Sequence, residues 1–424
     1  MYNIVKLLSI IMCISFFLQF HPAHAQSVNK PRDLSIETAI SKAMATNPDL
    51  VSSRAEIDKG RARIRQAGLY PNPKLSFELE GFGGSRDYSG TKIAEQTLAI
   101  EQEILLGNKT GKQINLAKKE LNLTRWDIAS LESDIRKEVK LSFVDVLSVQ
   151  GALALQQNLM EVSGQVYNTV KQKAEAGKVS PIEVIKADID LKKDRLELNM
   201  LKRSHYKTRK QLASFWGRIE PDFRKVSGNI DLLPPLVTEE VLRDALWNNP
   251  DLKRFKTEKR LMEAKFSVES AKRIPDLELS GGIRQIPETD DYAFVAGITV
   301  PLNIFDRNQG NIEKAGISLK QVMTRQSARF NLLRRELNAV YQEARIALNQ
   351  INTLKDDIIP STEKVFRSKQ EGYRSGKFNY LEVLDAKRVL FESKKQYIEY
   401  ITLYRQSIIK IERLTGESLD KDSL

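Results

Sequence analysis

The chain of 424 residues contains two copies of one plan, and this duplication limits its possible folds more than any other feature. AMATNPDLVSSRAE, from Ala43, and ALWNNPDLKRFKTE, from Ala245, share Asn-Pro-Asp-Leu at a spacing of 202 residues. EAGKVSPIEVIKA, from Glu175, and RSGKFNYLEVLDA, from Arg374, match at a spacing of 199 residues. Two copies of about 180 residues each indicate a duplicated domain and argue against a solenoid, which needs several short repeats.

The first 25 residues are predicted to be a signal peptide. Lys6 supplies a positive charge, Leu7 to Phe20 is nearly all apolar, and Ala23-His24-Ala25 offers small residues for cleavage after Ala25. The alternative is a membrane anchor, but about fourteen apolar residues fall short of the roughly 20 that a spanning helix needs. We therefore expect a mature chain that leaves the cytoplasm.

The remaining chain divides at a proline pair. Residues 26–225 form the first predicted repeat and residues 238–416 form the second, while residues 417–424 form a C-terminal tail. Residues 226–237 are the predicted linker, because Pro234-Pro235 cannot continue a helix.

Each repeat is predicted to run in the order helix, two strands, long helix, turn, helix. The strands are recognised by a period of two. In the first repeat Leu75, Phe77 and Leu79 alternate with polar residues, and a second extended run covers residues 92–105. In the second repeat the same alternation selects the following apolar positions: Leu277, Leu279, Ile283, Tyr292, Phe294, Ala296, Ile298 and Val300.

The long helices give the clearest periodic signal. A continuous helix over residues 112–176 would be roughly 100 Å long at about 1.5 Å per residue, which is far longer than a globular domain requires. Apolar residues step by three or four along it, as in a coiled-coil seam, and also along its counterpart, where we expect Pro360 to introduce a kink. The predicted seam positions are Ile128, Leu131, Ile135, Val139, Phe143, Val146, Val149 and Leu153, and then Leu333, Leu337, Val340, Ala344, Ala347, Ile351, Leu354 and Ile358.

Few cysteine or histidine side chains remain after the signal peptide. The only cysteine, Cys13, and two of the three histidines lie within it, which leaves His205, interpreted as a surface or seam residue. We therefore expect no metal site built from His or Cys and no cofactor. Without a nucleophile and base or a phosphate loop, we also expect no enzyme activity. The net charge of +12 is spread along the helices, and an exported protein rarely meets nucleic acid, so no nucleic-acid partner is expected.

Strands of about ten residues with one apolar and one polar face have two interpretations. They match the lipid-facing and lumen-facing alternation of an outer-membrane barrel, and they also match a small sheet packed on a soluble core. Four strands cannot close a barrel, and an open edge is not tolerated in hydrocarbon. If the strands span a membrane, several chains must share one barrel, and their long helices can then form a ring around a pore.

Several short motifs accompany the duplicated order. They are NPDL near the start of each repeat, YPNPKLSF and RIPDLELS before the strands, LLGNKTGK and FDRNQGN after them, and the two GK…EV…A turns. In this combination the chain resembles the TolC family of outer-membrane efflux proteins, and most of all its CzcC-like heavy-metal efflux branch. The resemblance extends from about residue 34 to residue 416.

The resemblance implies a mainly α fold with a small β part. Three chains would form a homotrimer in the Gram-negative outer membrane, with four strands per chain in a 12-stranded β-barrel and long helical hairpins in a periplasmic α-barrel. The trimer would contact outer-membrane lipid and receive substrate from an inner-membrane RND pump through a periplasmic adaptor protein. The implied function is a passive exit duct for heavy-metal or other cations.

Two alternatives stay open. Within the same class, the duct would export drugs or type I secreted polypeptides. From a different class, the chain would be a periplasmic coiled-coil scaffold without a channel, in which the strands form a soluble sheet.

The resemblance also implies roles for residues at the helical tips. Glu382 and Asp385, three residues apart on one helical face, would place rings of carboxylates inside the tunnel mouth, where they would attract cations. The alternative is that they are ordinary first-turn acids favoured by the helix N-terminus. Tyr373 and Glu183 would form a tip latch, whereas Phe378 stands where the family has the basic residue of a second link.

A substitute for that basic residue and an adaptor surface are expected at the turns. Lys377 or Arg374 would replace the basic residue of the second link. Gly177 and Gly376 are expected at turn positions that favour glycine, and with Lys178 and Lys377 they form the predicted adaptor contact.

Overall fold

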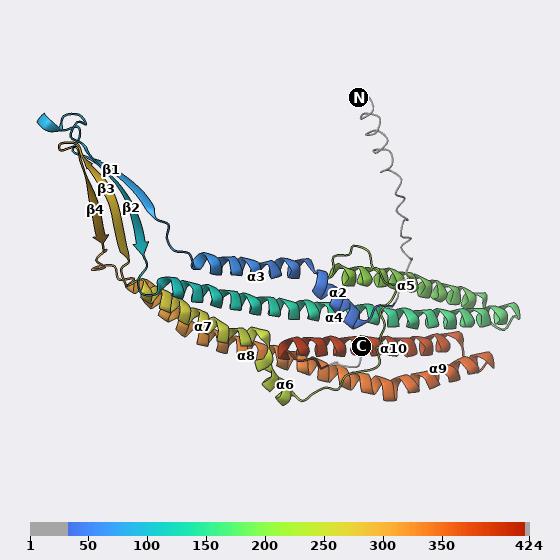
Figure 1. Ribbon diagram of the computed structural model, residues 1–424. Coiled ribbons are helices and arrows are strands. Elements are labelled where there is room, and N and C mark those ends of the chain that lie inside the picture. The colour runs from blue at the N-terminus through green and yellow to red at the C-terminus, as the bar shows by residue number, and fades with distance from the viewer. Residues whose placement is uncertain (1–32, 420–424) are drawn as a thin grey trace, which may run out of the picture.

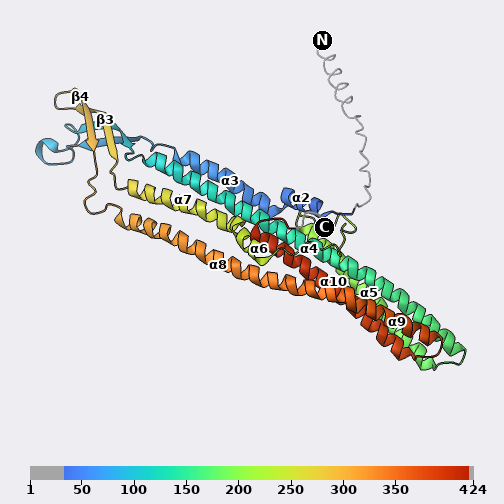
Figure 2. The same ribbon diagram turned by 90° about the horizontal axis from the view of Figure 1, so that it is seen from below.

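The computed structural model describes residues 33–419 of the chain, which has an elongated shape (Figure 1). The four strands lie together at one end, and long helices run from there toward the opposite end, where two helical hairpins finish in short turns (Figures 1 and 2). The predicted signal peptide, residues 1–25, lies outside the described residues. So do residues 420–424 of the predicted tail.

The strands form one antiparallel sheet with two strands from each repeat. Their order is β1-β2-β3-β4, so β2 and β3 join the two repeats. Their bounds are β1 Lys74–Glu80, β2 Glu95–Ile104, β3 Leu277–Ile286 and β4 Asp291–Thr299.

The register gives the sheet one apolar and one charged face. Opposite residues such as Phe77 and Leu98, or Ile283 and Phe294, share a face, and no strand residue on this face is charged. On the other face the register brings together Lys74, Arg284 and seven acids: Glu78, Glu80, Glu95, Glu101, Glu103, Glu278 and Asp291. The predicted alternation of apolar and polar positions is therefore confirmed.

The helices of the first repeat include one that is very long. Helix α4 runs without interruption through 67 residues, which confirms the predicted continuous helix. It is connected to the last helix of the repeat by a tight turn. The helices are α2 Ile36–Thr46, α3 Pro48–Ala67, α4 Lys109–Glu175 and α5 Pro181–Ser214, with a short 3-10 turn, η1, at Arg86–Tyr88 between the strands.

The second repeat follows the same order but its long helix is interrupted. The elements are α6 Glu239–Ala245, η2 Leu246–Asn248, α7 Pro250–Ala271, α8 Gln309–Thr353, the π turn η3 Leu354–Ile358, α9 Ile359–Arg374 and α10 Tyr380–Thr415. Figure 2 shows α8 running on into α9, with α10 beside them.

A π turn lies just before Pro360, where we expected a kink. Proline has no N–H to donate to the carbonyl of Asp356, four residues earlier, and its ring crowds that carbonyl. The widened turn relieves this crowding and adds a residue to the helical register. As a result Ile358, predicted as a seam residue, is 38% exposed, whereas Leu354 at the start of the turn is buried. The prediction for Ile358 was wrong for this reason.

The apolar seams form three separate cores. One joins α2, α4 and the end of α5, and a second joins α8 with α10; the third lies near the hairpin turns and includes Val170, Phe366 and Val383. Most predicted seam residues are buried in the first two cores, while Leu131, Val149, Leu153 and Val340 are half-buried. Narrow seams of this kind explain how a chain with 41% hydrophobic residues forms such long helices.

The shared Asn-Pro-Asp-Leu motif starts one helix in each repeat and connects it to the end of the repeat. Asn47 accepts hydrogen bonds from backbone N–H groups in the first turn of α3, and its amide donates to the carbonyl of Phe215 at 3.0 Å. Asn249 caps α7 in the same way and donates to the carbonyls of Arg413 and Leu414. Each motif thus caps the start of one helix and also connects that helix to the end of its repeat through hydrogen bonds.

The segment between α5 and α6 contains the predicted linker, residues 226–237. It has no regular helix or strand and lies against α10, where the Tyr404 hydroxyl donates to the carbonyl of Pro234 at 2.6 Å and Arg405 donates to the carbonyl of Asn229 at 2.7 Å. Among the helices of residues 33–419, none combines the length and apolar character needed to cross a membrane.

Candidate functional site at the hairpin turns

The two hairpins end in turns that are built alike. Gly177 after α4 has a φ of +67° and Gly376 after α9 has a φ of +83°, so both adopt the left-handed conformation expected of them. A Cβ atom at either position would meet nothing within 4 Å, so backbone conformation rather than space favours glycine here. Lys178 and Lys377 are exposed beside them. The four residues thus form accessible turns, and their role as an adaptor contact stays a prediction.

Glu382 and Asp385 lie at the start of α10 and share one face of that helix. Both line a groove of about 360 Å³ between α9 and α10, together with Lys369. Glu382 also completes a capping box: its carboxylate accepts from the backbone N–H of Asn379 at 3.2 Å, and its own N–H donates to the Asn379 side chain at 3.0 Å. Glu382 therefore does act as a first-turn acid, while Asp385 takes no part in the cap.

Each of the two carboxylates has a cationic neighbour. Lys369 Nζ lies 2.5 Å from Glu382 Oε2, and an Arg388 guanidinium nitrogen lies 2.9 Å from Asp385 Oδ1. Lys369, followed by the Asn379 N–H, holds the pKa of Glu382 below its ordinary value of 4.5. The Arg388 pair is largely exposed, so solvent screens it strongly and it contributes little to stability.

Tyr373 and Glu183, the predicted latch, are brought together within one chain. The Tyr373 hydroxyl lies 3.4 Å from Glu183 Oε2, at the long limit of a hydrogen bond. Lys173 lies 4.2 Å from the centre of the Tyr373 ring and donates to the Tyr373 carbonyl. Burial, and then the charge of Glu183, raise the pKa of Tyr373 to about 12, so its hydroxyl stays a donor at neutral pH. The latch function itself stays a prediction.

The ring of Phe378 is contacted by a basic residue, Lys369, that the sequence did not indicate. Lys369 Nζ lies 3.7 Å from the centre of the Phe378 ring while it also binds Glu382. The Phe378 ring packs so closely on Gly372 that a Cβ atom there would approach it to 2.3 Å. Lys377 and Arg374, which the sequence suggested as substitutes, are exposed.

A buried charged cluster next to the turns was missed by sequence reasoning. Lys387 of α10 contacts Asp190 and Asp194 of α5, and its ammonium donates to Ser163 of α4 at 2.9 Å. The side chain of Lys387 is only 7% exposed. The sequence signal is limited to the four-residue spacing of Asp190 and Asp194, because Lys387 lies 197 residues from Asp190.

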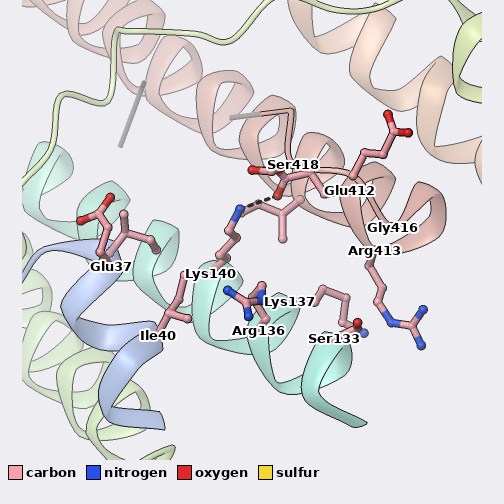
Figure 3. Close-up of a pocket in the computed structure, with 13 residues that line it drawn as sticks. Glu37, Ile40, Ser133, Arg136, Lys137, Lys140, Glu412, Arg413, Gly416 and Ser418 are labelled. Carbon is pink, nitrogen blue, oxygen red and sulfur yellow. Dashed lines mark hydrogen bonds and ion pairs between the residues drawn. The ribbon is translucent and has the colours of Figure 1, made fainter. Parts of the chain in front are cut away.

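A cavity of about 490 Å³ lies where α2, α4 and the end of α10 meet (Figure 3). Lys140 of α4 binds Glu412 of α10 there, with 2.6 Å between Nζ and Oε2. The lining carries four basic and three acidic side chains, namely Arg136, Lys137, Lys140 and Arg413 against Glu37, Glu412 and Glu417. With this balance the cavity favours neither cations nor anions, and we assign it no ligand.

No cluster of metal ligands is evident in the part of the chain that the structure describes. Across residues 33–419, no three His, Cys, Asp or Glu side chains lie close enough to hold a metal ion together. His205 lies half-buried on α5, 3.4 Å from the Gln150 side-chain oxygen, and burial followed by the charge of Arg209 lowers its pKa.

Comparisons with known proteins agree with this architecture. The sequence model described as outer membrane efflux protein matches residues 39–218 and 241–417. The cobalt-zinc-cadmium resistance protein CzcC of Cupriavidus metallidurans is 31% identical over 383 residues, which cover 90% of either chain. The nickel and cobalt resistance protein CnrC of the same organism is 22% identical over 72% of this chain and 71% of its own.

Solved structures show the same fold. The protein CusC, described in terms of transmembrane channel formation, superposes with a TM-score of 0.73 at 17% identity, covering 92% of this chain and 93% of that chain. The fold is therefore that of the TolC-like channels. With a family match in both repeats and a relative 31% identical along nearly the whole length, the chain belongs to the outer membrane efflux protein family.

Proposed function

We propose that the protein is the exit duct of a tripartite efflux system and that it conducts metal cations across the outer membrane. In this proposal three copies form one passive channel, which receives cargo from an inner-membrane RND pump through a periplasmic adaptor. The names of CzcC and CnrC support this cargo class, because they refer to resistance against cobalt, zinc, cadmium and nickel.

The observation that carries the proposal is the contrast between the two faces of the sheet. One face has no charged strand residue, whereas the other has a net charge of −5, from seven carboxylates against two cations. The whole chain has a net charge of +12, so this acidic face is not a consequence of overall composition. An apolar face suits lipid, and a negative face suits a water-filled lumen that attracts cations.

The free edges of the sheet support a trimer. β1 pairs only with β2 and β4 only with β3, so both outer strands of the described sheet have an unpaired edge. Backbone groups of such edges cannot remain unsatisfied in hydrocarbon. Strands from neighbouring copies would pair with them, and three copies of four strands give a closed barrel of an even strand number.

Helix α5 supports the same assembly. An exposed apolar stripe follows it at steps of three, four or seven residues, through Ile182, Ile185, Ile189, Leu196 and Met200. Such a stripe is typical of a coiled-coil seam that lacks its partner. In the proposed trimer a helix of the next copy covers it.

The hairpin turns are the proposed pump-facing mouth. Glu382 and Asp385 would attract cations at the constriction, and the Tyr373 and Glu183 pair would help to keep it shut. The exposed turns at Gly177 and Gly376 would receive the adaptor.

Growth on metals tests the proposal. A strain that lacks its own duct but keeps the adaptor and pump should regain resistance to cobalt, zinc or cadmium when it expresses this protein. Phe77→Arg should impair membrane assembly by about 2–4 kcal/mol, because it places a charge on the lipid face. The matched control is Ser76→Arg on the other face, which should assemble normally.

Two results would point elsewhere. Rescue of drug or solvent resistance without metal resistance would favour the alternative cargo class. If both arginine variants accumulated as water-soluble protein, as the wild type then would, the chain would be a periplasmic scaffold.

A further inference from the structure

Lys387 joins the two hairpins of one chain through a buried ionic cluster. Its ammonium has three protein neighbours, all in the first repeat: Ser163 Oγ at 2.9 Å, the carboxylate of Asp190, and Asp194 Oδ2 at 3.4 Å. An ammonium has three donors, so these neighbours can satisfy it completely. Ser163 in turn donates to Asp194. The cluster therefore connects α10 to both α4 and α5.

The cluster lies opposite the acidic pair on α10. Lys387 is two residues beyond Asp385, a rotation of about 200° around the helix, so the two side chains leave opposite faces. Lys387 faces the first hairpin, whereas Glu382 faces the groove beside α9. Asp385 lines that groove and also a larger one of about 950 Å³ between α10 and the first hairpin. Because all three residues lie on α10, the contacts that hold Lys387 in place also set the directions of Glu382 and Asp385.

Burial makes this connection stronger than the Tyr373 and Glu183 contact. The side chains of Lys387 and Asp194 are 7% and 14% exposed, so they are shielded from water and salt. The Tyr373 contact, by comparison, is one neutral donor at 3.4 Å from a carboxylate. Ion pairs with several hydrogen bonds are stronger than single long ones.

Loss of the lysine would leave a repulsive site. Asp190 and Asp194 would remain as two partly buried carboxylates without the ammonium between them, and a buried charge that loses its partner is strongly destabilising. Tyr380, whose ring is buried beside this cluster, could not replace the positive charge. Separation of the hairpins would admit water to the carboxylates and relieve this cost.

We propose that Lys387, together with Asp190 and Asp194, is the lock that holds the two hairpins of each chain together, and that this lock rather than the Tyr373 and Glu183 contact determines how readily the mouth opens. Lys387 acts as a positioning residue, because its ion pairs with α5 fix the orientation of α10 and with it the directions of Glu382 and Asp385. This inference rests on the proposed duct function.

Single-channel recording in planar lipid bilayers tests the lock. Lys387→Met keeps much of the side-chain volume and removes the charge. We expect it to raise the ratio of open to closed time by about tenfold or more, because a broken buried ion pair leaves an uncompensated charge. Tyr373→Phe should change the ratio much less.

Two further variants separate the ionic lock from general packing. Lys394→Met removes a 2.7 Å pair with Glu363 that stays within the second hairpin, so it should leave the open-to-closed ratio unchanged. The triple variant Lys387→Met, Asp190→Asn, Asp194→Asn removes all three charges and should close nearly as well as the wild type. If Lys387→Met fails to assemble, Asp190→Asn is recorded in its place and should give an intermediate ratio.

The outcomes are decisive in either direction. Wild-type-like gating of Lys387→Met, or of Asp190→Asn where that variant is used, overturns the lock, as does a triple variant as open as Lys387→Met or a larger effect of Tyr373→Phe. A wild-type protein that forms no channel at all would instead remove the proposed duct function, so the two failures are distinguishable.

Discussion

The two repeats share one plan but bond their Asn-Pro-Asp-Leu motifs to different extents. In the first, Asp49 is exposed. In the second, Asp251 accepts from Ser130 and lies 2.6 Å from Arg329 and 3.3 Å from Arg413. Ser130 belongs to the first repeat. The same four residues therefore specify the same helix start twice, while only the second copy uses the motif to hold the repeats together.

The long helices differ in a related way. α4 is continuous from the strands to the hairpin turn, whereas its counterpart is divided by the π turn before α9. The long helix of the first repeat is thus unbroken, whereas the long helix of the second repeat contains an irregular turn. Where matching positions make different contacts, we therefore expect changes to have larger effects in the second repeat.

The largest difference is expected between the two motif aspartates. Asp251→Ala should destabilise the protein by about 3 kcal/mol, because it leaves Arg413, which is largely buried, with fewer partners. Asp49→Ala should cost far less, since an exposed first-turn acid contributes mainly through the helix dipole. Thermal unfolding of the detergent-solubilised protein measures both, and equal losses would contradict the difference between the repeats.

The lowered pKa of Asp251 predicts that the stability of the protein depends on pH. Burial raises the pKa of Asp251, but hydrogen bonds from Ser130 and Arg329 and the charge of Arg413 outweigh it and keep the pKa below 3.8. A lowered folded-state pKa adds stability that is complete above the unfolded value near 3.8 and is lost as the pH falls through the folded value. The stability advantage of the wild type over Asp251→Asn should therefore shrink below about pH 3.8. An advantage unchanged at pH 3 would be inconsistent with this account.

The next effect concerns the two motif asparagines. Asn249→Ala removes a helix cap and two amide hydrogen bonds to carbonyls, and Asn47→Ala removes a cap and one. With about 1 kcal/mol for a cap and about 1 kcal/mol for each hydrogen bond, we expect losses of about 3 and about 2 kcal/mol. Unfolding midpoints of the two variants test this order, which would be wrong if Asn47→Ala lost more.

Two helical glycines are expected to give effects of opposite sign. Gly372→Ala places a Cβ atom against the Phe378 ring and should destabilise the turn of the second hairpin by about 1–3 kcal/mol. Gly164→Ala in α4 meets nothing within 4 Å and should stabilise the helix by about 0.5–1 kcal/mol. Limited proteolysis at the turns and thermal midpoints report both effects. Equal behaviour of the two variants would refute the packing argument.

The smallest contrast is expected at the turns themselves. Gly177→Ala and Gly376→Ala should each cost about 1 kcal/mol, since both force alanine into a left-handed conformation without other contacts. Here the two repeats should behave alike. A clear difference between the variants in thermal stability would show that one turn has a constraint beyond its backbone.

Local patterns predicted the fold well because each depends on residues close in sequence. The alternation around Phe77 gave the two faces of the sheet, the seam through Val139 gave the unbroken α4, and Gly177 and Gly376 gave the turns. The exception is Ile358, which was predicted to lie in the seam but is exposed because the π turn before Pro360 changed the helical register.

The site was predicted less completely because its contacts join distant residues. The family resemblance singled out Glu382, Asp385, Tyr373 and Glu183, whose roles stay predictions. The partners Lys369 and Lys387 were missed, since a lysine on a helix gives no local sign that it will be buried or that a given carboxylate will face it. The amide links of Asn47 and Asn249 were missed for the same reason.

Reversal potential in a planar bilayer tests the account most directly. With a salt gradient across the membrane, the purified protein should form channels that prefer cations, because the charged face of the sheet carries a net −5 per chain and the proposed mouth adds Glu382 and Asp385. Channels that prefer anions, or a purified protein that forms no channels, would contradict the account.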